Sequence, residues 1–248
     1  MIKQTFLNNN DCFKEGRYIT PKGLMLHSVG CSYSKASGFV ESWNKPGFMK
    51  CVHAFIDSND GVVWQTLPWN MRGWHAGGYA NNTHIGVEMC ESEFITYVDP
   101  EHSSDFTVDI PNIKKVQAQI TLAYYSAVAL FADLCEQYRL DPLKDGVVIS
   151  HSEGYKRGIA SNHTDPVHIW SGLGLPFTMD GFRKDVYKTM ANRFIDVPPG
   201  AWYADAVNWC YDHGIIKGVD KTHFNPDGNM TRAEMATVIY RLYQSLTK

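Results

Sequence analysis

The stretch Val147-Val148-Ile149-Ser150-His151-Ser152-Glu153-Gly154 decides the fold prediction, together with Ala160-Ser161-Asn162-His163-Thr164-Asp165-Pro166 just after it. An apolar, β-branched run that stops at a histidine is typical of a buried strand with a polar side chain at its end. The glycines, the asparagine and the proline that follow predict a loop. This loop returns His163 and Asp165 to the end of the strand.

A second apolar run with the same ending lies near the N-terminus, at Leu24-Met25-Leu26-His27-Ser28. If the two strands are neighbours in a sheet, His27 lies beside His151. Two imidazoles and one carboxylate, with an open fourth position, form the ligand set of a catalytic zinc ion. Asp165 is the expected carboxylate, and His163 remains an alternative third ligand. Each histidine alone could simply form hydrogen bonds in a core, but the convergence of three groups favours a metal site.

The composition limits the classes of protein that remain. A chain of 248 residues with a formal charge of −3 allows one large domain, or one domain with an appendage. It has no block of Lys and Arg for nucleic acid, and we expect no membrane span. The N-terminus turns polar too early for a signal peptide, so export by that route is not expected. The six cysteines form no CxxC pair and are interpreted as mostly reduced core residues.

A hairpin and a further strand are predicted between the two histidine strands. The turn Asn59-Asp60-Gly61 separates the apolar runs Cys51–Asp57 and Val62–Leu67, which predicts two antiparallel strands. The run Ile85–Glu91 predicts another strand and carries Glu88 in its middle. This carboxylate either faces solvent or points into a cleft as an acid or base.

Two helices complete the predicted first domain. Apolar residues recur at spacings of three and four from Asn112 to Tyr138, which predicts a long amphipathic helix, and Met179–Met190 predicts a shorter one. The segment Trp74–Gly78 is rich in glycine and is expected to be a loop, and Ser32–Gly47 is a polar segment that contains glycine. The fold class is therefore α/β, a mixed central sheet flanked by helices.

A change of composition around Asn192–Gly200 marks a domain boundary, which we place between residues 1–192 and 193–248. Beyond it, Trp202–His213 predicts a helix, and Thr231-Arg232-Ala233-Glu234 is a capping box that opens a last helix to about Leu246. This small all-α module has a marginal core. It should therefore lean on the first domain, on copies of itself or on another chain.

Several strings of the first domain resemble a known family in their residues and their order. They are Leu26-His27-Ser28, Val52-His53-Ala54-Phe55-Ile56, Asp60-Gly61-Val62-Val63-Trp64-Gln65, Trp74-His75-Ala76-Gly77, Ile85-Gly86-Val87-Glu88 and Thr164-Asp165-Pro166. The family is that of the zinc-dependent N-acetylmuramoyl-L-alanine amidases of the amidase-2 group, which is similar to peptidoglycan recognition proteins and phage endolysins. The resemblance covers about residues 20 to 190. It implies one zinc ion and hydrolysis of the amide between muramic acid and L-alanine in peptidoglycan.

The resemblance also implies roles for particular residues. His27, His151 and Asp165 look like the zinc ligands, and Glu88 falls where many members have a catalytic glutamate. His163 falls where a lysine is common and is expected to stabilise the oxyanion. The resemblance further suggests that His53, Trp74 and His75 bind substrate, with a supporting role behind the ligands as the alternative for the two histidines. Val52 is a departure, since some phage members carry a functional tyrosine there.

Residues 194–246 resemble one S-layer homology repeat, in Phe194-Ile195-Asp196-Val197, in Phe224-Asn225-Pro226-Asp227 and in the capping box. Such modules bind secondary polymers of the bacterial wall, and Trp202, Arg232 and Glu234 are the residues we expect to do so here. They usually occur in threes. A single copy therefore binds weakly, forms a homo-oligomer with copies on other chains, or is merely structural.

Taken with the expectation of no signal peptide, these resemblances imply a phage or prophage endolysin or an autolysin. Such a protein is made in the cytoplasm and reaches the wall after release, by holin-type lysis. Two alternatives remain. One is a non-catalytic peptidoglycan-binding protein, and the other is a zinc peptidase that acts on the stem peptide.

Overall fold

The computed structural model describes residues 1–98, 105–191, 194–198, 201–220 and 222–247. The predicted boundary at residues 192 and 193 lies outside these ranges. The chain forms two compact units, Met1–Val186 and Tyr187–Lys248, and each is described by itself.

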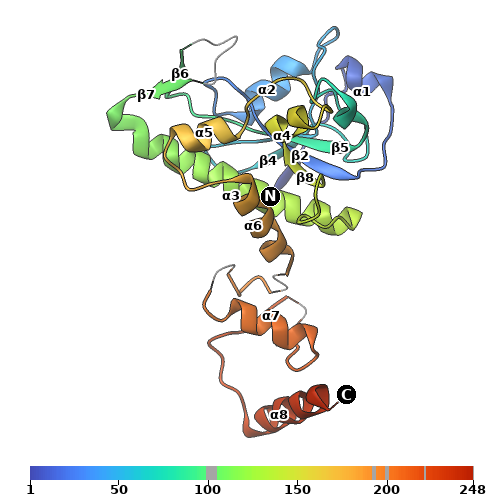
Figure 1. Cartoon of the computed structure of the whole chain (residues 1–248), viewed down its shortest axis with the longest axis vertical. Helices are drawn as coiled ribbons and strands as arrows, with labels where there is room; N and C mark the ends of the chain where they lie inside the picture. The colour runs from blue at the N-terminus through green and yellow to red at the C-terminus, as the bar shows by residue number, and fades with distance from the viewer. Residues whose placement is uncertain (99–104, 192–193, 199–200, 221, 248) are drawn as a thin grey trace. The chain divides into compact units, whose positions relative to one another are not determined.

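A six-stranded mixed sheet forms the centre of the first unit (Figure 1). In spatial order its strands are β1 (Ile2–Gln4), β4 (Val63–Gln65), β3 (Ala54–Ile56), β5 (His84–Met89), β2 (Gly23–Ser28) and β8 (Val148–Ser150). The four strands β3, β5, β2 and β8 are parallel to one another, whereas β4 is antiparallel to β3, and β1 is parallel to β4. The mixed sheet, the hairpin around Asn59-Asp60-Gly61 and the adjacency of the two histidine strands are therefore confirmed.

The register of the sheet assigns the polar residues to one face. His27 is paired with Glu88, and Glu88 is paired with Phe55, so these three side chains lie on the same side. Helix α2 (Ala36–Trp43) covers part of this face, where Phe39 stacks on Phe55 at 4.9 Å between ring centroids. Leu24 and Leu26 alternate with these polar positions and point to the other face.

The opposite face is covered by the long helix α3 (Ile113–Tyr138), which is the amphipathic helix expected from the periodicity (Figure 1). By length and composition alone, α3 is long and apolar enough to cross a membrane. However, 61% of its apolar window is buried inside the protein. Phe182 of α6 (Met179–Ala191) packs edge-to-face on Tyr124 and Phe131 of α3, which places α3 in the core.

Two segments that were not predicted to be helical contain helices. Ser32–Gly47 contains α2, and the segment after His151 begins with α4 (His151–Lys156). The reason for α4 is a capping box, in which the Glu153 N–H donates to Ser150 Oγ and the Ser150 N–H donates to Glu153 Oε2. The sequence patterns also did not indicate β1, α1 (Asp11–Glu15), β6 (Ile95–Tyr97), β7 (Phe106–Val108), α5 (Val167–Gly172) and the short 3₁₀ turns η1 (Tyr79–Asn82) and η2 (Ile110–Asn112).

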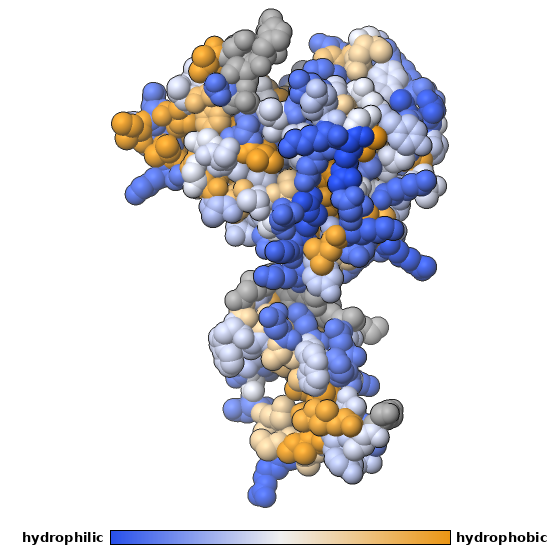
Figure 2. Space-filling model, in the orientation of Figure 1, coloured by the Kyte–Doolittle hydropathy of each residue, from blue (hydrophilic) through white to orange (hydrophobic). Residues whose placement is uncertain are grey.

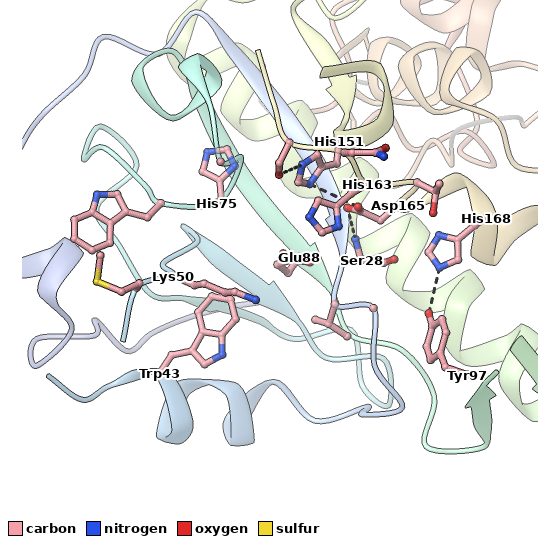
Figure 3. A pocket seen from close by; sticks show the side chains of 18 residues that line it. Ser28, Trp43, Lys50, His75, Glu88, Tyr97, His151, His163, Asp165 and His168 are labelled. Atoms are coloured by element: carbon pink, nitrogen blue, oxygen red, sulfur yellow. Dashed lines mark hydrogen bonds and ion pairs between the residues drawn. The ribbon is translucent and has the colours of Figure 1, made fainter. Parts of the chain in front are cut away.

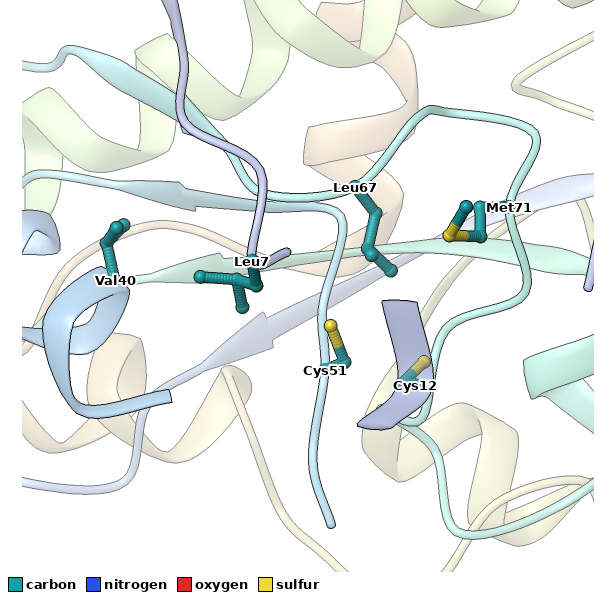
Figure 4. Packing of buried hydrophobic residues seen from close by; sticks show 6 residues of the cluster. All are labelled: Leu7, Cys12, Val40, Cys51, Leu67 and Met71. Atoms are coloured by element: carbon teal, nitrogen blue, oxygen red, sulfur yellow. The ribbon is translucent and has the colours of Figure 1, made fainter. Parts of the chain in front are cut away.

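The cysteines are free thiols, and four of the six are buried, as expected for core residues. Cys12 and Cys51 belong to an apolar cluster with Leu7, Val40, Leu67 and Met71 (Figure 4). This cluster packs the N-terminal segment and α1 against α2, the residue Cys51 before β3 and the segment that follows β4.

The second unit contains the two helices expected from its sequence, α7 (Ala204–Asp212) and α8 (Arg232–Leu246). Phe194, Val197, Ala204 and Val207 form its small core. The capping box of Thr231 and Glu234 opens α8, as expected. No residue of α8 is buried, and Figure 2 shows apolar surface over this helix. Its exposed apolar side chains are Met235, Ile239, Tyr240, Tyr243 and Leu246.

Candidate active site

Three potential metal ligands meet at the carboxyl ends of β2 and β8. His27 is near the end of β2, and His151 is the first residue of α4, directly after β8. Asp165 comes from the segment before α5 and lies against both histidines (Figure 3). All three residues are nearly inaccessible, with 1%, 5% and 7% of their surface exposed. A group of polar side chains buried this deeply needs a compensating partner.

The distances within this group fit a single tetrahedral ion. His27 Nδ1 lies 3.0 Å from His151 Nδ1 and 3.3 Å from Asp165 Oδ2, and His151 Nδ1 lies 3.6 Å from Asp165 Oδ1. Zinc bonds of 2.0–2.1 Å in a tetrahedron place neighbouring ligand atoms about 3.3 Å apart. The donor set of two nitrogens and one carboxylate oxygen is also one that zinc accepts, so the residues present fit this ion.

The electrostatics of the group point the same way. Burial lowers the pKa of His27, but the hydrogen bond to Asp165 and the charge of Glu88 outweigh it, so the pKa is raised overall. Burial and the neighbouring His27 lower the pKa of His151 to about 3. Burial raises the pKa of Asp165, but the His27 hydrogen bond and charge lower it overall. The three inward-facing ligand atoms therefore favour one positive charge between them. A bound cation would supply such a charge.

Glu88 lies beside the metal-ligand group, because it is the β5 residue paired with His27. Burial raises the pKa of its carboxyl group to about 7, despite the opposing effect of the charge of His27. Its Oε2 atom is buried without a hydrogen-bond partner among the described residues. A carboxylate whose pKa is near neutrality can both accept and return a proton. Glu88 therefore faces the cleft and not solvent.

His163 lies on the exposed side of the same group. Its ring centroid is 4.5 Å from that of His151, and it lines the cleft. The ligand atoms that face one another belong to His27, His151 and Asp165. The arrangement leaves the His163 ring free to contact a bound molecule.

The three residues expected to bind substrate have different surroundings. Trp74 and His75 line the cleft, and the Trp74 indole N–H donates to Glu15. His53 does not line it, because the ring is fully buried, with Nε2 bonded to the Met71 carbonyl and Nδ1 accepting the Gly86 N–H. The structure thus gives His53 a packing position behind the cleft.

The cleft has a volume of about 740 Å³ and is lined by several residues that the sequence analysis did not identify. Among them are Trp43, Met49, Lys50, Tyr97 and His168. Lys50 is the one Lys or Arg among the described lining residues, and Figure 3 shows its amine extending toward Glu88. No motif singles out these residues, and the available signal for Lys50 was its position next to the predicted 51–57 strand.

Behind the cleft lies a second buried carboxylate, Glu91. Its Oε1 accepts the Gly30 N–H at 3.0 Å, and its Oε2 accepts the Tyr97 hydroxyl at 2.6 Å. The Tyr97 oxygen is also 3.1 Å from His168 Nε2. Glu91 thereby holds the segment after β2 and the wall residue Tyr97 in fixed positions.

In the second unit, the three residues expected to bind the wall differ in their exposure and in the hydrogen bonds that they already form. The Trp202 side chain is 94% exposed. Arg232 is exposed at the start of α8, but the Glu234 carboxylate already accepts bonds from the N–H and hydroxyl of Thr231. Glu234 therefore caps its own helix.

Comparison with known proteins identifies the family to which this chain belongs. The model of the N-acetylmuramoyl-L-alanine amidase family Amidase_2 matches residues 17–168, and that of the S-layer homology domain matches residues 193–236. The first match covers more than half of the chain. The chain belongs to the N-acetylmuramoyl-L-alanine amidase family and carries an S-layer homology domain.

Curated relatives share parts of the sequence. The N-acetylmuramoyl-L-alanine amidase CwlH of Bacillus subtilis is 29% identical over 100 residues, which is 37% of this chain and 38% of CwlH. Protein Ami of Listeria monocytogenes is 28% identical over 166 residues, 64% of this chain and 15% of Ami. Exoglucanase XynX of Acetivibrio thermocellus is 43% identical over 229 residues, 87% of this chain and 20% of XynX. The chain spans well under half the length of each of these relatives.

Solved structures agree with the fold. The hydrolase AmiA of Staphylococcus aureus, in complex with its ligand, superposes with a TM-score of 0.57 over 80% of this chain and 87% of that one, at 18% identity. The catalytic domain of XlyA gives a TM-score of 0.51 over 75% of this chain and 99% of that one, at 20% identity. The amidase-2-like mixed sheet with flanking helices is thereby confirmed.

Proposed function

We propose that this chain is a zinc-dependent N-acetylmuramoyl-L-alanine amidase that hydrolyses the amide between N-acetylmuramic acid and L-alanine in peptidoglycan. The observation that carries the proposal is the inward-facing set of His27 Nδ1, His151 Nδ1 and Asp165 in a cleft, next to Glu88, whose Oε2 has no hydrogen-bond partner among the described residues. Membership in the amidase family supports the reaction, and the donor set supports the metal.

In this proposal the protein's own groups divide the work of amide hydrolysis. When bound, zinc supplies Lewis acidity toward the amide carbonyl and the attacking water. Glu88 takes a proton from that water and delivers one to the alanine nitrogen, so the products are a lactyl carboxylate and a free amine. His163 donates a hydrogen bond to the oxygen on which negative charge develops. Trp74 and Lys50 line the cleft and orient the glycopeptide.

The products distinguish this amidase from its rivals. Mass spectrometry of digested muropeptides should find intact lactyl-muramic acid and peptides that begin with a free L-alanine amine. New amines elsewhere in the stem peptide would instead establish a peptidase. Binding without any new amine in the zinc-loaded protein would establish a peptidoglycan-binding protein without catalysis.

The metal set is tested separately. One zinc ion should be found per chain, and it should be lost in His27→Ala and His151→Ala. Full zinc occupancy in either variant would contradict the ligand set. Retention in Asp165→Ala together with loss in His163→Ala would make His163 the third ligand.

For the second unit we propose attachment to a secondary polymer of the bacterial wall, with Trp202 and Arg232 as contact residues. The family match and the exposure of Trp202 support this role. The unburied apolar residues of α8 further support assembly of several copies, and the molecular mass in solution would test it.

We propose a bacteriolytic role, as an endolysin or an autolysin, with release at lysis through a holin-type pore. Cells that express the chain alone should stay intact, and they should lyse when the membrane is permeabilised. Lysis without permeabilisation would contradict this route.

A further inference from the structure

The two histidines of the metal-ligand group each have a second ring nitrogen, and both of these nitrogens point to one loop. His27 Nε2 lies 3.0 Å from His75 Nδ1. His151 Nε2 lies 3.3 Å from Ser161 Oγ, which in turn donates to the Ala76 carbonyl. Residues 75 and 76 thus support both ligands, although they lie far from both in the sequence.

Each of the two series of hydrogen bonds ends at a backbone carbonyl, which can only accept. This fixes the direction of every bond before it. His75 Nε2 is 3.1 Å from the His84 carbonyl, which can only accept, so this nitrogen carries the hydrogen. In the neutral ring Nδ1 is then an acceptor, and His27 must donate to it through Nε2–H. Likewise, the Ser161 hydroxyl donates its hydrogen to the Ala76 carbonyl, so Ser161 Oγ accepts the hydrogen bond from His151 Nε2–H. With Nε2–H donated in this way, Nδ1 is the nitrogen that each ring can offer to a metal. A bound cation would take the place of the hydrogen through which His27 Nδ1 contacts Asp165.

The loop itself is held rigidly enough to play this part. Asn81 Oδ1 accepts the N–H groups of both His75 and Ala76, at 3.0 and 2.8 Å. The His75 ring packs directly over Gly86 of β5, where a Cβ would lie 2.4 Å from the ring. A side chain at this position would displace the ring, so the glycine in Ile85-Gly86-Val87-Glu88 makes room for it.

We propose that His75 and Ser161 are positioning residues, which fix the tautomers of His27 and His151 so that both Nδ1 atoms are presented to the metal. This inference rests on the proposed zinc site. Groups that bind the outer nitrogen of a metal-ligating histidine orient its ring and typically account for a 10- to 100-fold change in metal affinity. His75 acts through His27 and does not need to touch the substrate.

The test measures zinc affinity by competition with a chromogenic chelator. His75→Leu, which has no acceptor, should weaken zinc binding by about 10- to 100-fold, and Ser161→Ala should weaken it toward the lower end of that range. His75→Asn restores an acceptor at nearly the position of Nδ1 and should recover most of the affinity. The matched control is His84→Gln, because the His84 ring is also largely buried but bonds to Thr83 and the Gly146 carbonyl.

A second readout separates positioning from a general loss of structure. In the zinc-loaded protein, ¹⁵N chemical shifts should place hydrogen on Nε2 of both His27 and His151, with Nδ1 bound to the metal. Binding through Nε2, or wild-type affinity in His75→Leu with a native circular dichroism spectrum, would overturn the proposal. Equal loss of affinity in His75→Asn and His75→Leu would also overturn it. A wild-type protein that binds no zinc would instead refute the zinc site itself.

Discussion

Replacing Glu91 by Gln should make the stability of the first unit less dependent on pH. Glu91 is fully buried and forms no ion pair with a described residue, although it accepts bonds from Tyr97 and Gly30. Burial raises the pKa of its carboxyl group to about 7 from a usual value of 4.5, in spite of the opposing Tyr97 hydrogen bond. The folded protein therefore holds a proton that the unfolded chain releases between pH 4.5 and 7.

The sign of the effect follows from this difference in bound protons. Between pH 4.5 and 7 the folded state binds more protons, so the free energy of unfolding decreases as the pH rises. Below that window both states are protonated, and above it the loss is complete. A shift of about 2.5 units corresponds to roughly 3 kcal/mol, at 1.36 kcal/mol per unit. Gln does not titrate and keeps an acceptor for Gly30, so the variant should lack this loss.

The assay is urea unfolding of wild type and Glu91→Gln, in chelator, at half-unit steps from pH 4.5 to 8. The relevant quantity is the difference between the two curves, since all other titrating groups are common to both proteins. This difference should change by roughly 3 kcal/mol in favour of the variant as the pH rises. Glu93→Gln is the control, because that carboxyl group is largely exposed. Parallel curves for wild type and Glu91→Gln would refute the reasoning.

Four further predictions concern the proposed activity. Glu88→Gln should lower turnover by roughly 10²- to 10⁴-fold with zinc retained, and wild-type turnover would assign the proton transfer to another group. His163→Ala should also lower turnover without loss of zinc, which metal analysis and kinetics together would check. Lys50→Met should raise KM several-fold for stem peptides with free carboxylates, whereas Lys45→Met, outside the cleft, should leave KM unchanged. Deleting residues 193–248 should preserve cleavage of soluble muropeptides and abolish binding to purified walls; unchanged wall binding would contradict the anchoring role.

The sequence was sufficient to predict the centre of the sheet and its polar end. Apolar runs that end in His27 and His151 fit buried strands, and the structure pairs these strands as parallel neighbours, which brings their carboxyl ends to the same edge. The long period-3.6 pattern of α3 is equally unambiguous, because a stripe of that length fits no strand. These predictions rest on patterns that extend over many residues.

The short helices could not be predicted in the same way, because glycines within them suggest loops. Gly38 lies inside α2 and Gly154 inside α4. A Cβ at Gly38 would lie 2.3 Å from the Tyr33 hydroxyl oxygen, and one at Gly154 would lie 2.7 Å from Met25 Cε. Both glycines are therefore explained by close packing. Gly38 packs against Tyr33, which precedes the helix, and Gly154 packs against Met25, which is distant in the sequence. A pattern of local residue preferences contains no information about such contacts.

The histidines of the site also show what a sequence pattern can and cannot predict. Val52-His53 and Trp74-His75 look alike in the sequence, and both histidines were expected to contact substrate or, as the alternative, to support the ligands from behind. In the structure His53 bonds only to backbone groups, at Met71 and Gly86, whereas His75 bonds to a metal-ligand candidate, His27. What separates them is the partner of each ring nitrogen, and that partner is chosen by the packing of a loop on β5. Residue type and position along a strand can place a histidine near a site, but its role depends on the acceptor that fixes its tautomer.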